Sequence, residues 1–127
     1  MDEKRESQIV GKYPEFFPCF RGDPAKTCLA WGLAIGDGWA DLFDKLCADI
    51  KALNPSPDFR FEQVKEKFGG LRAYWSGGGD ACEAIQVLVD AAEEMSFRVC
   101  EGCGTTEGVT VEGGWIKALC PACRRPA

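Results

Sequence analysis

The 127-residue sequence predicts an α+β fold, in which two amphipathic helices pack on a small antiparallel sheet and a ribbon follows at the C-terminus. Three observations predict this fold. Residues 38–53 and 80–96 each carry one apolar stripe at helical spacing. Residues 58–76 alternate apolar and polar side chains around a Gly-Gly pair, which is typical of a β-hairpin. Near the C-terminus, two Cys-x-x-Cys pairs enclose a second alternating segment.

Composition and charge are those of a small globular protein with an acidic surface. The chain is 46% hydrophobic and 28% charged, with a net charge of −5. We expect two parts, a body over residues 1–97 that includes an irregular N-terminal arm, and a ribbon over residues 98–127. The ribbon is expected to pack on the body, because a two-stranded hairpin cannot bury Trp115 and Ile116 alone.

The N-terminal arm, residues 1–27, is interrupted by three prolines and leaves room for one short helix. Residues 1–8 are strongly polar and are expected to be disordered. They contain no apolar stretch typical of a secretory signal, and no apolar run reaches the roughly 20 residues that span a bilayer. We therefore expect a cytoplasmic protein that does not enter a membrane. Residues 28–36 are apolar on both sides and fit either a buried strand or a loop.

The two helices have recognisable ends in the sequence. Asp37 is placed to cap the helix over residues 38–53, and Asn54-Pro55 stops it. Asp80 is placed to cap the helix over residues 80–96. The stripe expected to be buried on the first helix consists of Trp39, Leu42, Phe43, Leu46, Cys47, Ile50 and Leu53. That of the second consists of Ile85, Leu88, Val89, Ala92 and Met95.

Residues 59–68 leave two interpretations open. Aromatic residues alternate with polar ones at the start of this segment, which favours a strand. However, Phe61, Val64 and Phe68 also fit the spacing of a helix. We prefer the strand, because Gly69-Gly70 supplies a turn into a second alternating segment.

The cysteine spacing predicts one structural zinc ion. Cys100, Cys103, Cys120 and Cys123 form two Cys-x-x-Cys knuckles separated by a short predicted hairpin, which is the order of a zinc ribbon. Four thiolates would fill the tetrahedral coordination of zinc and leave no position for a reacting molecule. A redox-active cysteine pair or an iron site is the alternative interpretation.

The remaining cysteines and the absence of histidine limit the chemistry. Cys19, Cys28, Cys47 and Cys82 lack the paired spacing of a second metal site, so we interpret them as buried thiols. The chain contains no histidine, which excludes Ser-His-Asp and Cys-His catalysis as well as histidine-ligated catalytic metals. We therefore assign no catalytic residues.

One surface outside the ribbon is a candidate for interaction. Basic and aromatic residues lie around the predicted Gly69-Gly70 turn and could bind an anion or a nucleotide. The alternative is a charged hairpin edge that discourages strand pairing. The residues of this surface are Lys65, Lys67, Arg72, Tyr74 and Trp75.

Several of these motifs, in this order, resemble a group of small, mostly uncharacterised bacterial and phage or prophage proteins. The motifs are Trp31-Gly32, Gly36-Asp37-Gly38-Trp39, Leu46-Cys47, Val64 to Gly69, Leu71-Arg72, Tyr74, the two knuckles and Gly113-Gly114-Trp115. The resemblance covers residues 31–123. It brings no established activity, but it implies a phage or mobile-element setting, where many small acidic proteins act by binding a host protein.

Three classes of function follow from the sequence. The first is a non-enzymatic zinc-binding protein that acts through protein–protein interaction, such as a phage-encoded inhibitor or modulator of a host complex. The second is a nucleic-acid-binding zinc ribbon, which the acidic net charge disfavours. It would use basic residues with aromatic stacking by Trp75 or Trp115, the basic set being Lys65, Lys67, Arg72, Lys117, Arg124 and Arg125. An enzyme is the class that the residues favour least.

Overall fold

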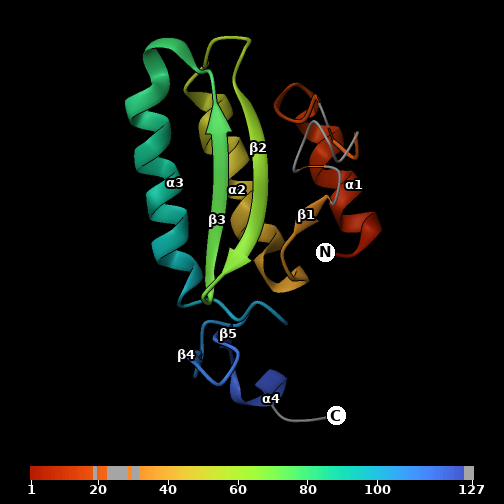
Figure 1. Ribbon diagram of the computed structural model, residues 1–127, viewed down its shortest axis with the longest axis vertical. Helices are drawn as coiled ribbons and strands as arrows, with labels where there is room; N and C mark the ends of the chain where they lie inside the picture. The colour runs from red at the N-terminus through yellow and green to blue at the C-terminus, as the bar shows by residue number, and fades with distance from the viewer. Residues whose placement is uncertain (19, 23–28, 30–31, 125–127) are drawn as a thin grey trace.

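The computed structural model describes residues 1–18, 20–22, 29 and 32–124, and it has the expected α+β architecture (Figure 1). The helices and strands, in chain order, are α1 (Glu3–Lys12), β1 (Leu33–Ala34), α2 (Ala40–Ala52), β2 (Arg60–Lys67), β3 (Gly70–Ser76), α3 (Cys82–Ser96), β4 (Thr110–Glu112), β5 (Lys117–Leu119) and α4 (Pro121–Arg124). Short 3-10 turns lie at Pro14–Phe16, Asp37–Trp39 and Gly79–Ala81. Among the described residues, none of the helices combines the length and the apolar character that crossing a membrane requires.

The central sheet has three strands in the order β1-β2-β3. Strands β2 and β3 form the predicted antiparallel hairpin, which settles residues 60–67 as a strand rather than a helix. The register shifts between Phe61 and Gln63, so the strand contains a β-bulge. The sheet also differs from a purely antiparallel one, because the two residues of β1 pair in parallel with β2, Leu33 opposite Val64.

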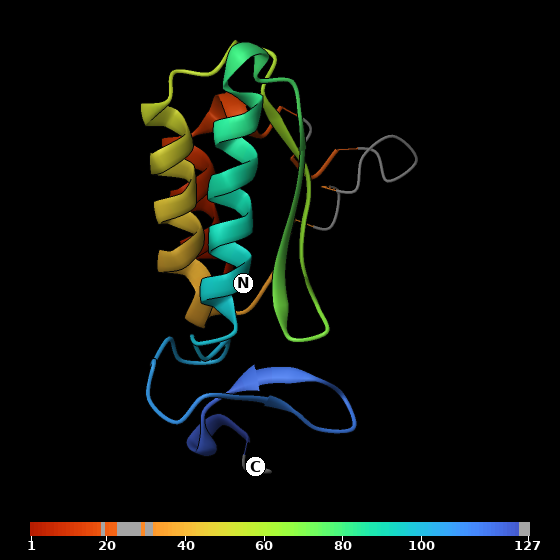
Figure 2. The same cartoon turned by 90° about the vertical axis from the view of Figure 1, so that its left-hand side faces the viewer.

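Helices α2 and α3 lie side by side on one face of the hairpin (Figure 2). Their apolar stripes and the inward side chains of the strands form one core, in which Trp39, Phe43, Phe59 and Phe61 are almost completely buried. Leu53 and Met95, at the ends of the predicted stripes, remain exposed. Aromatic side chains from the N-terminal segment complete the core, since the Phe17 ring stacks on Phe61 with 5.4 Å between centroids.

The N-terminus corrects the sequence prediction, because helix α1 occupies a segment expected to be disordered. Asp2 caps the helix by accepting the backbone N–H of Arg5 at 3.3 Å. Ile9 is fully buried, and the buried carboxylate of Glu6 accepts the backbone N–H of Leu33 in β1 at 2.8 Å. Ion pairs also join α1 to α2, namely Arg5–Asp41 and Lys12–Asp44. Tertiary contacts therefore order a segment whose local polarity indicated disorder.

The predicted helix caps are also wrong in detail. Asp37 and Asp80 each fall in a 3-10 turn before the helix, and neither α2 nor α3 has a side-chain cap. The Asp37 carboxylate instead accepts the backbone N–H of Asp2 at 2.6 Å. The 3-10 turns move the helix starts to Ala40 and Cys82 and leave both aspartates outside the capping position.

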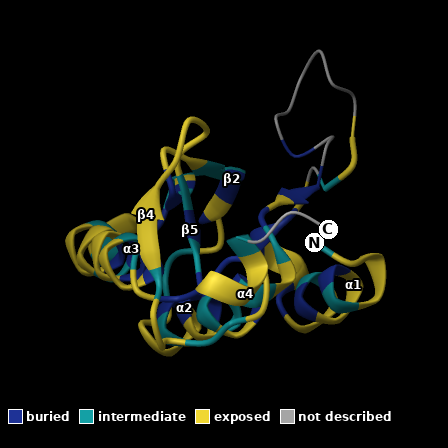
Figure 3. Cartoon of the chain, turned by 90° about the horizontal axis from the view of Figure 1, so that it is seen from below, coloured by how far each residue is buried: buried dark blue, intermediate teal, exposed yellow. Residues whose placement is uncertain are grey.

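We call residues 98–124 the ribbon. The ribbon lies at one end of the body, beyond the turn between β2 and β3, in both views of the chain (Figures 1 and 2). Its strands β4 and β5 pair antiparallel, with Val111 opposite Ala118. Seen from the ribbon end, β4 and much of α4 are exposed, whereas Ala118 in β5 is fully buried (Figure 3).

Candidate metal centre

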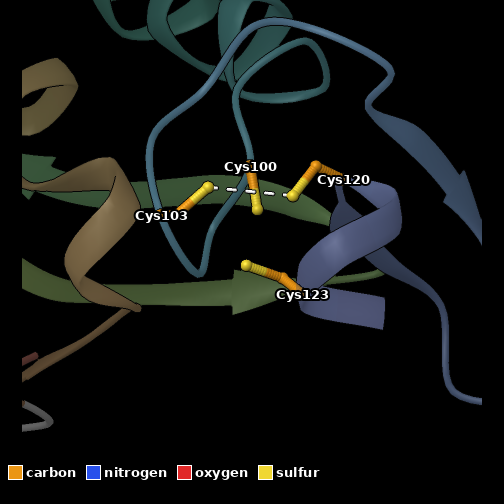
Figure 4. A group of neighbouring side chains, drawn as sticks. All are labelled: Cys100, Cys103, Cys120 and Cys123. Atoms are coloured by element: carbon orange, nitrogen blue, oxygen red, sulfur yellow. Dashed lines mark hydrogen bonds between the residues drawn. The ribbon is translucent and has the colours of Figure 1, made fainter. Parts of the chain in front are cut away.

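The structure brings together the sulfurs of two Cys-x-x-Cys pairs that are far apart in the sequence. The Sγ atoms of Cys100, Cys103, Cys120 and Cys123 all lie within 4.8 Å of one another. The Sγ atoms of Cys103 and Cys120 are 3.7 Å apart, and the other two side chains point into the same space (Figure 4). A tetrahedral site with metal–sulfur bonds of about 2.3 Å has sulfurs about 3.8 Å apart. The four sulfurs therefore fit around one metal ion.

Local structure explains why each sulfur faces the centre. The first knuckle is a tight turn, closed by hydrogen bonds from Cys100 N to Thr105 O at 2.9 Å and from Gly104 N to Cys100 O at 2.8 Å. Gly104 has a φ of +86°, which a residue with a side chain rarely adopts. The second knuckle begins where β5 ends and continues into α4, so one helical turn places Cys123 beside Cys120.

The thiols of Cys100 and Cys123 differ in how readily they ionise. Burial opposes ionisation of the Cys100 thiol, but backbone N–H groups of Cys120, Cys103 and Gly102 outweigh this effect and lower its pKa to about 6. Hydrogen bonds to the other three sulfurs favour the protonated form of Cys123 and raise its pKa to about 12. A metal ion that binds all four sulfurs would displace the protons that remain on them.

Gly36, Asp37 and Gly38, in the turn before α2, contact the first knuckle, and we call these three residues the socket. The sequence did not reveal them as part of the site. Gly38 donates its N–H to the Glu101 carbonyl at 2.8 Å, and Gly36 donates to the Glu101 carboxylate at 2.9 Å. A Cβ at Gly38 would collide with the Cys100 carbonyl and lie 2.6 Å from Gly104 N. These glycines are required for close approach of two backbones rather than for flexibility.

Trp39, which is buried in the core, also stabilises the contact between the first knuckle and the body. Its indole N–H donates to the Val99 carbonyl at 2.8 Å, and the whole side chain is buried. Because Val99 directly precedes the first ligand, the indole fixes the point where the chain enters the knuckle. The sequence singles out Gly36-Asp37-Gly38-Trp39 as a motif, but nothing local indicates what it contacts.

A lysine also joins the ribbon to the body. Lys117 of β5 lies 2.9 Å from Glu66 of β2 and 3.4 Å from Glu101, measured between Nζ and Oε1. Partial burial opposes its charge, but the two carboxylates outweigh this effect and raise the pKa of Lys117 above its ordinary value. Lys117 therefore stabilises the position of the ribbon.

The predicted interaction surface is divided between the two faces of the β2–β3 hairpin. Lys65 lies opposite Arg72 across the strands, and its Nζ is 5.8 Å from the centroid of the Tyr74 ring, so these three residues share the face away from the core. Lys67 lies two residues further along the same strand face, at the turn. Arg72 also reaches Glu93 of α3, with 3.7 Å between Nη1 and Oε1.

Trp75 does not belong to that outer face. It lies opposite Phe61 in the strand register, and its ring is 5.8 Å from the ring of Phe59, between centroids. It is partly buried and packs against the core. The alternation of the strand explains this separation, because neighbouring residues point to opposite faces.

The other described cysteines do not converge on a second centre. Cys47 is fully buried, and burial raises the pKa of its thiol well above the ordinary value. Cys82 is partly buried and donates a hydrogen bond to the Gly77 carbonyl at 3.1 Å. Within the described residues, the ribbon cysteines form the one group that could hold a metal ion. Cys19 and Cys28 lie outside the described residues.

Comparison with known proteins adds nothing to this picture. No protein-family model, curated protein or solved structure matches the chain. The fold and the four-cysteine centre are therefore the starting points for its function.

Proposed function

We propose that the protein binds one structural zinc ion and acts without catalysis, by holding an exposed apolar surface in place for a protein partner. The observation that supports this proposal is the contrast within the ribbon. Its first knuckle is joined to the body by a hydrogen bond from Gly38 to Glu101, whereas Trp115, in the turn between β4 and β5, is 80% exposed. A large apolar side chain left in water on a rigid support is typical of an interaction site.

Zinc is the metal that this ligand set favours. Four thiolates in a tetrahedral arrangement suit zinc or iron, and the closed coordination suits a structural role. The absence of histidine from the sequence removes the commonest general base, which also favours a binding role over catalysis.

The arrangement of the basic residues favours a protein over a nucleic acid. Lys117 is held between two carboxylates, and Arg72 is paired with Glu93. Arg124 donates to the carbonyls of Thr110, Glu112 and Lys117, so its charge is used within the ribbon. Three of the six basic residues that a nucleic-acid site would use are thus engaged internally, while Arg125 lies outside the described residues. The resemblance to phage proteins suggests a host protein in the bacterial cytoplasm as the partner.

Metal analysis tests the first half of the proposal. The purified chain is expected to contain one equivalent of zinc, and the Cys100→Ser/Cys120→Ser variant is expected to contain none. A Cys47→Ser/Cys82→Ser variant is the matched control and should keep its zinc, since neither residue lies in the centre. Iron in place of zinc, or equal metal content in both variants, would contradict the assignment.

Affinity capture from a bacterial lysate tests the second half, with and without nuclease treatment. A protein that remains bound after nuclease treatment, and that is lost when the zinc is chelated, supports the proposal. Recovery of nucleic acid alone would favour the second candidate, a nucleic-acid-binding ribbon.

A further inference from the structure

An apolar cleft lies where the turn of the β2–β3 hairpin meets the turn of the ribbon. Its volume is about 310 Å³, within the range of sites that hold a small ligand or a large side chain. We call it the hairpin cleft, and its lining residues are Glu66, Lys67, Phe68, Gly114, Trp115 and Ile116. Three of these are large apolar side chains left in water, since Phe68 is 64%, Trp115 80% and Ile116 42% exposed.

The conformation of Phe68 makes its presence in the turn unexpected. Phe68 and Gly69 both have positive φ, +53° and +84°, as a two-residue hairpin turn of type I′ requires. Asn, Asp or Gly is favoured at the first of these positions, and a bulky residue there is strained. The ring gains little from burial either. Neither the turn nor the core therefore accounts for an aromatic side chain at this position.

The two turns that form the cleft are fixed relative to each other. A Cβ at Gly69 would lie 2.7 Å from a methyl group of Val111 and 3.4 Å from one of Ile116, so the ribbon rests directly on the turn of the hairpin. The ion pair of Lys117 with Glu66 fixes the same contact. The cleft is therefore a preformed feature whose shape depends on an ordered ribbon.

The free charge beside the cleft is positive, although the chain as a whole is acidic. Lys67 stacks over the Phe68 ring at 5.7 Å and Lys65 over the Tyr74 ring at 5.8 Å. No carboxylate of the described residues pairs with either lysine, whereas the Glu66 carboxylate is already bonded to Lys117 and to Gly69 N. A negatively charged partner would find two available cations here.

We propose that the hairpin cleft binds an acidic peptide segment of the partner protein, with a bulky apolar side chain between Phe68 and Trp115 and carboxylates on Lys65 and Lys67. This inference rests on the proposed protein-binding function and names the surface and the chemistry of the segment it takes. An apolar cleft with an aliphatic wall suits a side chain, and two lysines on a chain of charge −5 are few for a nucleic-acid backbone. A short acidic segment needs no more than these two.

The test begins with selection from a display library of random short peptides against the zinc-loaded chain. The Phe68→Gly/Trp115→Ala variant serves for counter-selection. Selected peptides are expected to combine an aromatic or branched apolar residue with neighbouring Asp or Glu. Their affinity for purified variants is then measured by fluorescence anisotropy at low and high salt.

Each part of the surface has its own variant and control. Phe68→Gly and Trp115→Ala should each weaken peptide binding by about tenfold or more, while Val87→Ala, at an exposed residue of α3, should not change it. Lys67→Glu should weaken binding and reduce its salt dependence, while Lys4→Glu makes the same change of charge on α1 without effect. Zinc content and unfolding midpoint are measured for every variant, so that a lost fold is not mistaken for a lost contact.

Four results would overturn the inference. The first is selection of no peptides, or of peptides whose binding ignores these variants. The second is tighter binding of an oligothymidine probe than of any acidic peptide, which would make the cleft a nucleic-acid site. The third is self-association that depends on Trp115, which would make a second copy the occupant. The fourth is a captured protein that binds all the variants equally well, in which case protein binding stands and the cleft is not its site.

Discussion

At the scale of single residues, Gly38 and Phe68 each stand at a position with an unusual local requirement. Gly38 lies against the backbone of the first knuckle and leaves no room for a methyl group. Phe68 presents a large side chain from a backbone conformation that favours residues such as Asn and Gly. The first position is set by packing, and we interpret the second as set by binding.

Replacing Gly38 by alanine should therefore disrupt the contact between the socket and the backbone of the first knuckle. The added Cβ meets the Cys100 carbonyl and Gly104 N, both backbone atoms that cannot rotate away. We expect the free energy of unfolding to fall by about 1–3 kcal/mol, measured in denaturant with zinc in excess. Gly114→Ala is the control, because a Cβ there has nothing within 4 Å. Equal effects of the two substitutions would argue against a role of Gly38 in docking the knuckle.

Phe68→Gly is not expected to lower the free energy of unfolding, in contrast to Gly38→Ala. Glycine relieves the strain of a positive φ at a side chain that is 64% exposed, and little burial is lost. We expect the variant to be as stable as the parent or up to about 1 kcal/mol more stable, in thermal unfolding followed by circular dichroism. A clear loss of stability would mean that the ring supports the fold rather than a partner.

At the scale of elements, the ribbon is attached to the body by the socket and by Lys117. The first contact involves the turn before α2 and the second involves strand β2, so two separate segments of the body hold the ribbon. Glu101 takes part in both, because its carboxylate accepts from Gly36 and lies near Lys117. The side chain at the centre of the first knuckle thus links the metal site to the sheet.

Removing the charge of Lys117 should weaken this attachment. Lys117→Met leaves Glu66 and the buried Glu101 without their cation, and we expect a loss of about 1–3 kcal/mol at neutral pH. Arg98→Met is the matched control, because its exposed pair with Glu94 should contribute about 0–0.5 kcal/mol. Unfolding in denaturant measures both, and similar values would remove Lys117 from the account of docking.

The contribution of Lys117 to the free energy of unfolding should decrease at high pH. The pKa of the lysine is raised in the folded protein, so its stabilising effect is complete below the unfolded value of about 10.4. The effect is lost as pH rises through the folded pKa. The difference in stability between the parent chain and Lys117→Met should therefore stay constant at neutral pH and shrink above about pH 10.5.

At the scale of the whole molecule, the four-cysteine centre and the core contribute unequally to the body and the ribbon. The core reaches from the N-terminal aromatics through α3 to Val99 and Ala118, but the ribbon adds few other buried apolar side chains and its strand β4 is exposed. The ribbon depends on four sulfurs meeting at one point. Loss of the ion should then unfold the ribbon first and remove one wall of the hairpin cleft.

Chelation tests this division of stability. A chelator is expected to release one metal ion per chain and to unfold the ribbon, and acid should do the same by protonating the thiolates. In hydrogen exchange, the amides of Gly36 and Gly38, which donate to Glu101, should lose protection, while the amides between β2 and β3 keep it. Unchanged protection of the ribbon after complete removal of the metal would contradict a structural role for the ion.

The parts of the fold that could be predicted are those whose sequence pattern lies within one segment of the chain. Helical and alternating periodicity lie within single segments, so α2, α3 and the β2–β3 hairpin could be predicted from their own residues. The four cysteines that converge could be named for the same reason, because each Cys-x-x-Cys pair is complete within four residues. The disorder expected over residues 1–8 was wrong, because helix α1 is ordered by contacts with α2 and β1 that its own polar sequence does not show.

The sequence by itself therefore determined the α+β architecture and which four sulfurs come together. The tertiary structure alone decided how the ribbon joins the body: Gly38 facing the first knuckle, Lys117 between two carboxylates, and the cleft between Phe68 and Trp115. Each of these contacts joins residues that are distant along the chain. Close approach, burial and charge pairing exist only once those segments have packed together, so no local pattern in the sequence can contain them.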